Sequence, residues 1–225
     1  MLREPDVRKE GYRVGLLGGT FDPPHTAHLV VAEWARDALA LDEVWFVPAH
    51  VPPWKRARVV ASPAERLAML RLAVSGRPYL AVETVEYERP GPSYTADTLT
   101  TLRRRYPGVT FVFLLGSDAL AGLPRWHGFP GILDLASFAV FVRPPHTPDA
   151  VSHTIEEVAA AAGVSPSRFV AVDVPPLGIS SSLVRRRLCE GRSVRSLVPD
   201  AVLTYILERA LYLPPACGAV GLGDG

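Results

Sequence analysis

The sequence is poor in cysteine and lysine and has no long hydrophobic run. Among its 225 residues are two cysteines, Cys189 and Cys217, and two lysines, Lys9 and Lys55, although 24 residues are basic. Two cysteines so spaced form neither a metal cluster nor a disulfide framework, so we expect free thiols and a reducing compartment. No apolar stretch approaches the roughly 18 residues that span a bilayer, and residues 1–12 lack the apolar core of a signal peptide. We therefore expect a cytoplasmic protein without membrane attachment.

The charge of the chain is almost balanced. The chain has 24 Lys and Arg residues and 23 Asp and Glu residues, which gives a formal net charge of +1. Apolar residues make up 48% of it. This balance disfavours an Arg-rich nucleic-acid-binding module, which needs a basic surface. The apolar share is typical of a globular protein, and the length suffices for a full hydrophobic core. We expect a single domain over residues 11–213, between a flexible N-terminus of residues 1–10 and a disordered tail of residues 214–225.

Short apolar runs alternate with helical periodicity along this domain. Strands are expected at residues 12–17, 44–47, 80–83, 110–115, 137–142 and 169–172. Helices are expected between and after them, at residues 26–41, 63–75, 95–105, 147–163, 181–190 and 199–212. Such alternation favours parallel strands, because each helix carries the chain back to the starting edge of the sheet. The expected fold is therefore α/β, a Rossmann-like doubly wound parallel sheet with helices on both faces.

The loop after the first strand has the composition of a phosphate-binding site. It reads GGTFDPPHTAH from Gly18 to His28. Parallel sheets bind ligands beyond the carboxyl ends of their strands, glycine lets a phosphate approach the backbone, and a helix N-terminus offers free N–H groups. His25 and His28 are three residues apart at the start of the helix, so their rings point the same way. The spacing matches neither the dinucleotide fingerprint nor the P-loop, since no Gly-Lys-Ser/Thr follows.

This loop resembles the signature GGTFDPxHxGH of the H-x-G-H nucleotidyltransferase superfamily, and further segments resemble bacterial nicotinate-nucleotide adenylyltransferases. The further segments are PPWK at 52–55, SYTADTL at 93–99, LGSD at 115–118 followed by Trp126, and ISSSLVR at 179–185. All the matches occur in the order of that family, over residues 14–185. Three positions depart from its pattern: Ala27 replaces the usual Gly, Trp54 stands where His is common, and Ser182 replaces Thr.

The resemblance implies a reaction between two anionic substrates. A phosphate oxygen of nicotinate mononucleotide would attack the α-phosphorus of ATP, giving deamido-NAD and pyrophosphate in NAD biosynthesis. The attacking phosphate is already ionised at neutral pH, so no strong general base is needed. The protein must align the two polyanions and stabilise the charge of the transition state. The implied cofactor is Mg²⁺ held by the phosphates of ATP, with no metal ligand from a protein side chain.

The resemblance also assigns roles to individual residues. The catalytic groups would be His25, His28, Lys55 and Arg185, acting as positive partners of the phosphates. The ATP site would consist of Gly18, Gly19, Thr20, Phe21, His28, Gly116, Asp118, Ile179, Ser180, Ser181 and Arg185. The nicotinate mononucleotide site would consist of Lys55, Tyr94, Thr95, Asp118 and Trp126. In that site the ring of Trp126 would stack on nicotinate, and N–H donors near Thr95 would select its carboxylate.

Two alternatives stay open. A sister adenylyltransferase for nicotinamide mononucleotide or pantetheine phosphate would share the first motif, although the pantetheine enzyme is shorter and lacks SYTADTL. A non-catalytic ATP-binding sensor would use the same loop without turnover, but the four catalytic candidates are all present. We expect ATP and nicotinate mononucleotide as partners, and neither nucleic acid nor membrane. A homo-oligomer is compatible with the sequence.

Overall fold

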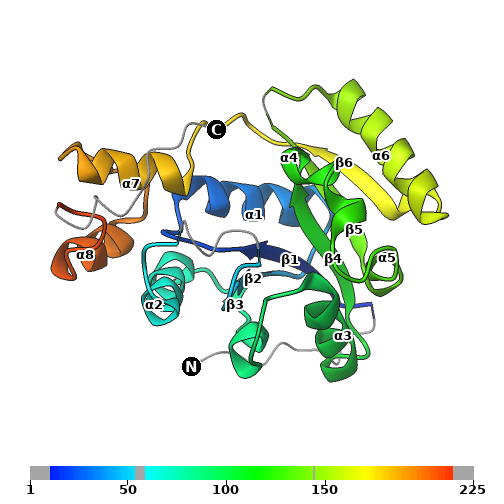
Figure 1. Cartoon of the computed structure of the whole chain (residues 1–225), viewed down its shortest axis with the longest axis horizontal. Helices are drawn as coiled ribbons and strands as arrows, with labels where there is room; N and C mark the ends of the chain where they lie inside the picture. The colour runs from blue at the N-terminus through cyan, green and yellow to red at the C-terminus, as the bar shows by residue number, and fades with distance from the viewer. Residues whose placement is uncertain (1–10, 54–58, 144, 215–225) are drawn as a thin grey trace.

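The computed structural model describes residues 11–53, 59–143 and 145–214. Its sheet has six strands in the order β3-β2-β1-β4-β5-β6, and every neighbouring pair is parallel (Figure 1). The strands are β1 (Arg13–Gly19), β2 (Glu43–Pro48), β3 (Leu80–Val82), β4 (Thr110–Gly116), β5 (Ser137–Val142) and β6 (Phe169–Asp173). The order reverses between β1 and β4, which creates the crevice where doubly wound sheets bind ligands. The expected Rossmann-like α/β fold is confirmed.

Helices connect the strands and cover both faces of the sheet. They are α1 (Thr26–Ala38), α2 (Pro63–Val74), α3 (Thr95–Arg105), α4 (Ser117–Leu120), α5 (Ile132–Leu135), α6 (Pro148–Ala162), α7 (Ser181–Cys189) and α8 (Asp200–Glu208). The six longer helices lie where periodicity predicts them. Helices α4 and α5 were not predicted, because a single helical turn is too short to show a 3.6-residue period.

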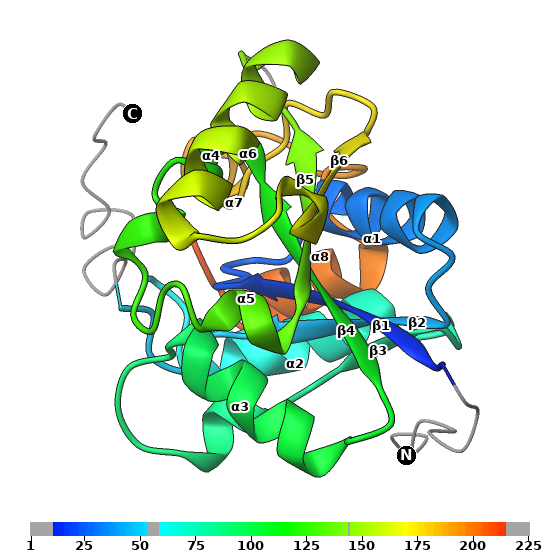
Figure 2. The same ribbon diagram turned by 90° about the vertical axis from the view of Figure 1, so that its right-hand side faces the viewer.

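Helices lie on both faces of the sheet (Figure 2), and a cluster of buried apolar side chains lies between the sheet and the helices on each face. Leu99 of α3, Leu133 of α5 and Ile155 of α6 belong to the cluster on one face. Leu29 of α1 and Leu70 of α2 belong to the cluster on the other face. Because both faces are covered, the strands are apolar along nearly their whole length, as is typical of parallel sheets.

A third apolar cluster joins α2 to the two C-terminal helices. Met69 of α2 contributes to it together with Val184 of α7 and Val202 of α8. Figure 1 shows α2, α7 and α8 gathered at one end of the molecule, with α6 at the other. Helix α2 is therefore packed on two sides, against the sheet and against α7 and α8.

Cys189, the last residue of α7, is disulfide-bonded. This corrects the expectation of a free thiol, because spacing along the chain does not reveal which thiols meet in space. Cys217 and the predicted flexible segment at residues 1–10 lie outside the described residues, as does the predicted tail beyond residue 214. The domain bounds thus stay a prediction.

None of the helices in the described ranges combines the length and apolar character of a membrane-spanning helix.

Candidate functional site

The loop between β1 and α1 lies at the reversal of strand order. Gly18 and Gly19 end β1, which pairs with β2 on one side and β4 on the other. Phe21 has a left-handed backbone (φ 52°), and its ring is buried against Phe46. A Cβ at Gly19 would lie 3.0 to 3.2 Å from the Phe21 ring, so any larger residue there would have to displace that ring by a few tenths of an ångström. Left-handed non-glycine residues persist where packing fixes them, often at functional loops.

His25 and His28 stack across the first turn of α1. Their ring centroids lie 3.6 Å apart with an interplanar angle of 21°. The backbone N–H of His25 donates to Nδ1 of His28 over 3.1 Å. Because Nδ1 accepts a hydrogen bond, the N–H of the His28 ring is on Nε2. The structure thus fixes which nitrogen of His28 would donate to a substrate oxygen.

His25 is uncharged at neutral pH. Its side chain is only 6% exposed, and burial lowers its pKa to about 3, with a smaller contribution from the positive charge of Arg143. His25 was predicted to be a positive partner of phosphate, but its burial makes it a neutral ring that can only position groups or share hydrogen bonds. Its Nδ1 has no hydrogen-bond partner among the described residues.

The start of α7 lies against the β1–α1 loop. Nη1 of Arg185 donates to the backbone oxygen of Asp22 over 2.6 Å and lies 3.7 Å from its carboxylate. Ser181 Oγ donates to the carbonyl of Pro23 over 2.8 Å. Ser180 caps α7 through a bond from the Leu183 N–H to its Oγ, over 3.1 Å. Two of the predicted ATP residues, Ser181 and Arg185, therefore contact the loop directly, and Asp22 engages the Arg185 guanidinium.

Asp22 is the buried anchor of the loop, a role that the sequence did not suggest. Its carboxylate accepts hydrogen bonds from the N–H groups of Val60 (2.8 Å) and Ala61 (3.0 Å) and from the hydroxyl of Tyr212 (2.7 Å). Burial, with the adjacent charge of Asp22, raises the pKa of Tyr212 and keeps its hydroxyl protonated. Together with Arg185, these contacts tie the loop to three segments distant in sequence.

A pocket of about 200 Å³ adjoins the same loop and contains three of the five residues predicted to bind nicotinate mononucleotide, Tyr94, Thr95 and Trp126, whereas Asp118 does not line it. It is lined by Gly19, Thr20, Ala49, Pro52, Pro53, Ser93, Tyr94, Thr95, Trp126 and His127. The Tyr94 ring stacks on His127 with centroids 4.4 Å apart, and Trp126 lies edge-on to Phe113 at 6.0 Å. Sequence analysis gave His127 no role. Lys55 lies outside the described residues, so its predicted role is untested.

The ends of β4 and β5 form the opposite side of the site. A Cβ at Gly116 would collide with the Asp118 carboxylate and lie 3.4 Å from Nη1 of Arg143. Arg143 directly follows β5, and its charge reaches His25. We missed Arg143 in the sequence. The position of Arg143 in the sequence could have suggested a role, because Arg143 directly follows a strand whose carboxyl end lies beside the crevice.

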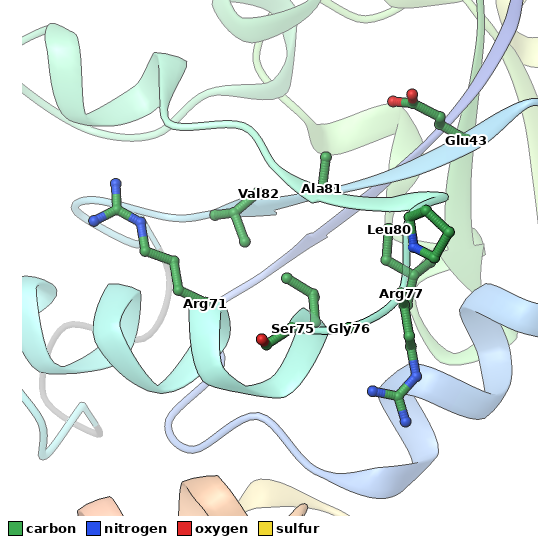
Figure 3. Close-up of a pocket in the computed structure, with 10 residues that line it drawn as sticks. Glu43, Arg71, Ser75, Gly76, Arg77, Leu80, Ala81 and Val82 are labelled. Carbon is green, nitrogen blue, oxygen red and sulfur yellow. The ribbon is translucent and has the colours of Figure 1, made fainter. Parts of the chain in front are cut away.

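A larger cavity, of about 540 Å³, contains none of the predicted site residues. It lies along the edge strand β3 and the C-terminal end of α2, where Arg71 and Arg77 extend in opposite directions (Figure 3). Within the ranges that the structure describes, His, Cys, Asp and Glu side chains form no group of three that could hold a metal ion. The predicted roles around the β1–α1 loop remain predictions, but that loop is where most of their residues meet.

Comparisons with known proteins point to the same chemistry. Residues 16–187 match the family model described as Cytidylyltransferase-like. A probable nicotinate-nucleotide adenylyltransferase of Thermomicrobium roseum is 43% identical over 200 residues, covering 89% of this chain and 91% of that protein. One from Geobacillus thermodenitrificans is 40% identical, covering 89% of this chain and 86% of that protein.

Solved structures share the fold. The Plasmodium falciparum nicotinic acid mononucleotide adenylyltransferase complexed with NaAD has a TM-score of 0.69 at 21% identity, covering 89% of this chain and 97% of that chain. The same enzyme complexed with APC has a TM-score of 0.68 at 20% identity, with the same coverage. The family model extends from β1 into α7, and with the relatives at 40% identity and above it shows that this chain belongs to the cytidylyltransferase-like family, alongside the nicotinate-nucleotide adenylyltransferases.

Proposed function

We propose that this protein transfers the adenylyl group of ATP to nicotinate mononucleotide in NAD biosynthesis. A phosphate oxygen of the mononucleotide attacks the α-phosphorus, the bond from the α-phosphorus to the bridging oxygen breaks, and pyrophosphate leaves with that electron pair. One observation carries the proposal. Gly19 and Thr20 belong to the loop of the paired histidines and also line the pocket that holds Tyr94, Thr95 and Trp126. Two substrates bound there would meet at the loop.

The loop residues would act mainly by positioning and by stabilising charge. The Nε2–H of His28 would donate to an α-phosphate oxygen as negative charge grows in the transition state. His25 holds the orientation of that ring by stacking and through its backbone N–H. Arg185 and Lys55 would supply positive charge near the β- and γ-phosphates and the attacking phosphate. Mg²⁺ would enter with ATP, bound by phosphate oxygens, and would offset the charge of the leaving pyrophosphate.

The start of α3 favours the acid over the amide. Thr95 is the first residue of α3 and lines the pocket, and the side chain of the preceding Tyr94 makes no capping hydrogen bond. A helix N-terminus carries partial positive charge, so a carboxylate is stabilised there and a neutral amide less so. This arrangement supports nicotinate mononucleotide as the acceptor.

Pyrophosphate release tests the proposal. The protein is incubated with MgATP and, separately, with nicotinate mononucleotide, nicotinamide mononucleotide or pantetheine phosphate. The highest kcat/KM is expected with nicotinate mononucleotide, with deamido-NAD as the product. Preference for another acceptor would identify a sister enzyme, and ATP binding without release in any arm would identify a sensor. Either outcome would reject the proposal.

The proposal includes a cytoplasmic location, because the reaction draws on ATP. The disulfide at Cys189 would be unusual in a reducing compartment. Titration of free thiols, in protein isolated under thiol-blocking conditions, measures what fraction of Cys189 is in the disulfide form in the cell. A fully formed disulfide there would contradict a reducing location.

A further inference from the structure

Arg66 is the least exposed charged side chain among the described residues. It lies in the first turn of α2, and only 1% of its surface is exposed. No ion pair within residues 11–53, 59–143 and 145–214 includes it, and its Nε has no hydrogen-bond partner there. Burying a guanidinium without a carboxylate carries a desolvation cost that its hydrogen bonds must offset. Packing alone therefore does not account for an arginine at this position.

The guanidinium of Arg66 binds three backbone carbonyls. Nη1 donates to the oxygens of Thr20 (2.8 Å) and Ala49 (2.7 Å), and Nη2 donates to the oxygen of His50 (3.0 Å). Thr20 follows β1, whereas Ala49 and His50 follow β2, the neighbouring strand. A planar guanidinium holds its acceptors in one fixed geometry, which a lysine ammonium does not. One side chain thus sets the spacing between two loops.

These two loops form one wall of the mononucleotide pocket. Thr20 and Ala49 line it directly, and Pro52 and Pro53 continue the β2 loop along it. The positive charge of Arg66 lies directly behind the carbonyls of that wall, in an interior where charges are weakly screened. A dianionic phosphate bound in front of the wall would be attracted by that charge.

Glu86 holds the β2 loop from the opposite side. Its carboxylate accepts a hydrogen bond from the backbone N–H of His50 and another from Thr98 Oγ1 of α3, over 2.7 Å. Val51 of the same loop is also hydrogen-bonded to Ser93 of the far wall. The β2 loop is therefore tied to the far wall without Arg66, so loosening the contacts of Arg66 would alter the spacing of the β1 and β2 loops while the β2 loop stays tied to α3.

We propose that Arg66 is a positioning residue for nicotinate mononucleotide, which fixes the pocket wall formed by the β1 and β2 loops and adds positive charge behind it. The inference rests on the proposed function. Arg66 itself would not contact the mononucleotide, because the backbone carbonyls that Arg66 binds lie between its guanidinium and the substrate. Disturbing it should impair binding of the mononucleotide more than binding of ATP.

The variants Arg66→Lys and Arg66→Met test this role, with Arg71→Met as the matched control. Arg71 is exposed and lies on the same helix, beside the larger cavity (Figure 3). We expect Arg66→Met to raise the KM for nicotinate mononucleotide about tenfold or more while the KM for ATP changes less than about twofold. Arg66→Lys keeps the charge without the planar fork, so a smaller rise is expected, and Arg71→Met should resemble the wild type.

Circular dichroism establishes that each variant is folded, and Arg66→Lys carries the test if Arg66→Met is not. Two outcomes would overturn the inference and show a purely structural role. One is an equal rise in the KM for nicotinate mononucleotide and the KM for ATP. The other is unchanged KM values in folded variants of lower stability. If the wild type and Arg71→Met do not turn over nicotinate mononucleotide, the proposed function fails separately. The same variants are then compared by calorimetric binding of nicotinate mononucleotide, where an unchanged Kd overturns the role of Arg66.

Discussion

His25 and His28 stack on each other, yet their surroundings give the two rings different chemical properties. Burial keeps His25 neutral down to a pKa of about 3. His28 receives a hydrogen bond on Nδ1, so its remaining ring donor is Nε2. The two rings therefore act as a hydrogen-bond donor and its support and not as two cations. In the proposed function, positive charge would come from arginine, from lysine and from Mg²⁺ that enters with ATP.

The donor role of His28 predicts a large loss of turnover in His28→Ala. Removing one preorganised donor to a developing charge lowers kcat by about 100-fold to 1,000-fold. The KM for ATP should change only a few-fold, because the contact strengthens in the transition state. His28→Gln can place an amide N–H near the former Nε2, so it should retain more activity than His28→Ala. Steady-state kinetics of the two variants provide the measurement, and near-wild-type kcat in His28→Ala would remove His28 from the reaction.

The neutral state of His25 predicts acid sensitivity. Its pKa is about 3 in the folded protein and near 6.5 when unfolded, so between these values the unfolded chain binds a proton that the native state does not. Stability contributed by neutral His25 is present above pH 6.5 and falls by about 1.4 kcal/mol per pH unit as the pH drops toward 3. Urea unfolding at several pH values gives the free energy of unfolding as a function of pH. Between pH 3 and 6.5 this free energy should change less steeply with pH for His25→Gln than for the wild type. Parallel slopes would contradict the assigned pKa.

Residues with unusual surroundings were the hardest to predict. The signature containing Asp22 marked the loop, and helical periodicity predicted a helix at residues 63–75, but neither revealed that Asp22 and Arg66 are buried. Helix α2 packs against the sheet on one side and against α7 and α8 on the other. Its sequence therefore lacks a clean polar face, and no periodicity distinguishes Arg66 from an arginine on the surface.

At the scale of elements, the C-terminal part of the chain closes around the β1–α1 loop. The N–H of Thr26 donates to the Leu197 carbonyl over 2.8 Å, and Thr26 Oγ1 donates to the Ser196 carbonyl over 3.0 Å. Tyr212, just beyond α8, reaches Asp22 on the other side of the loop. The start of α1 is thus fixed by residues more than 150 positions away, as the 170-residue separation of the Thr26–Ser196 bond illustrates.

The variant Tyr212→Phe isolates one of these ties. It removes a donor from the buried carboxylate of Asp22, so the free energy of unfolding should fall by about 1 to 3 kcal/mol. Tyr205→Phe, on the partly exposed side of α8, should change it by less than about 0.5 kcal/mol. Urea unfolding measures both. A loss no greater in Tyr212→Phe than in Tyr205→Phe would show that the hydroxyl contributes little to the loop.

Apolar runs and helical periods located every strand and every longer helix, because those signals are local. The approach of α7 to the loop was not local, since Arg185 and Asp22 are 163 residues apart. The resemblance placed Arg185 in the ATP site but gave Asp22 no role, and their direct contact depends on how α7 packs against α2. The positions of the elements along the chain could therefore be predicted from the sequence, but their packing against one another could not.

At the scale of the whole molecule, the crevice is built from segments spread over most of the chain, so substrate binding should stabilise the entire fold. A ligand that binds only the native state adds RT ln(1 + [L]/Kd), about 2.7 kcal/mol at 100 times its Kd. Deamido-NAD joins the mononucleotide to the adenylyl group of ATP in one molecule and should raise Tm more than either substrate at equal concentration. Nicotinamide mononucleotide, which lacks the carboxylate facing α3, should raise Tm less than nicotinate mononucleotide. Thermal unfolding followed by fluorescence measures all the shifts. Equal shifts for the acid and the amide would mean that the start of α3 does not select between them, and the preference for nicotinate would then have to arise after binding, in the transfer step.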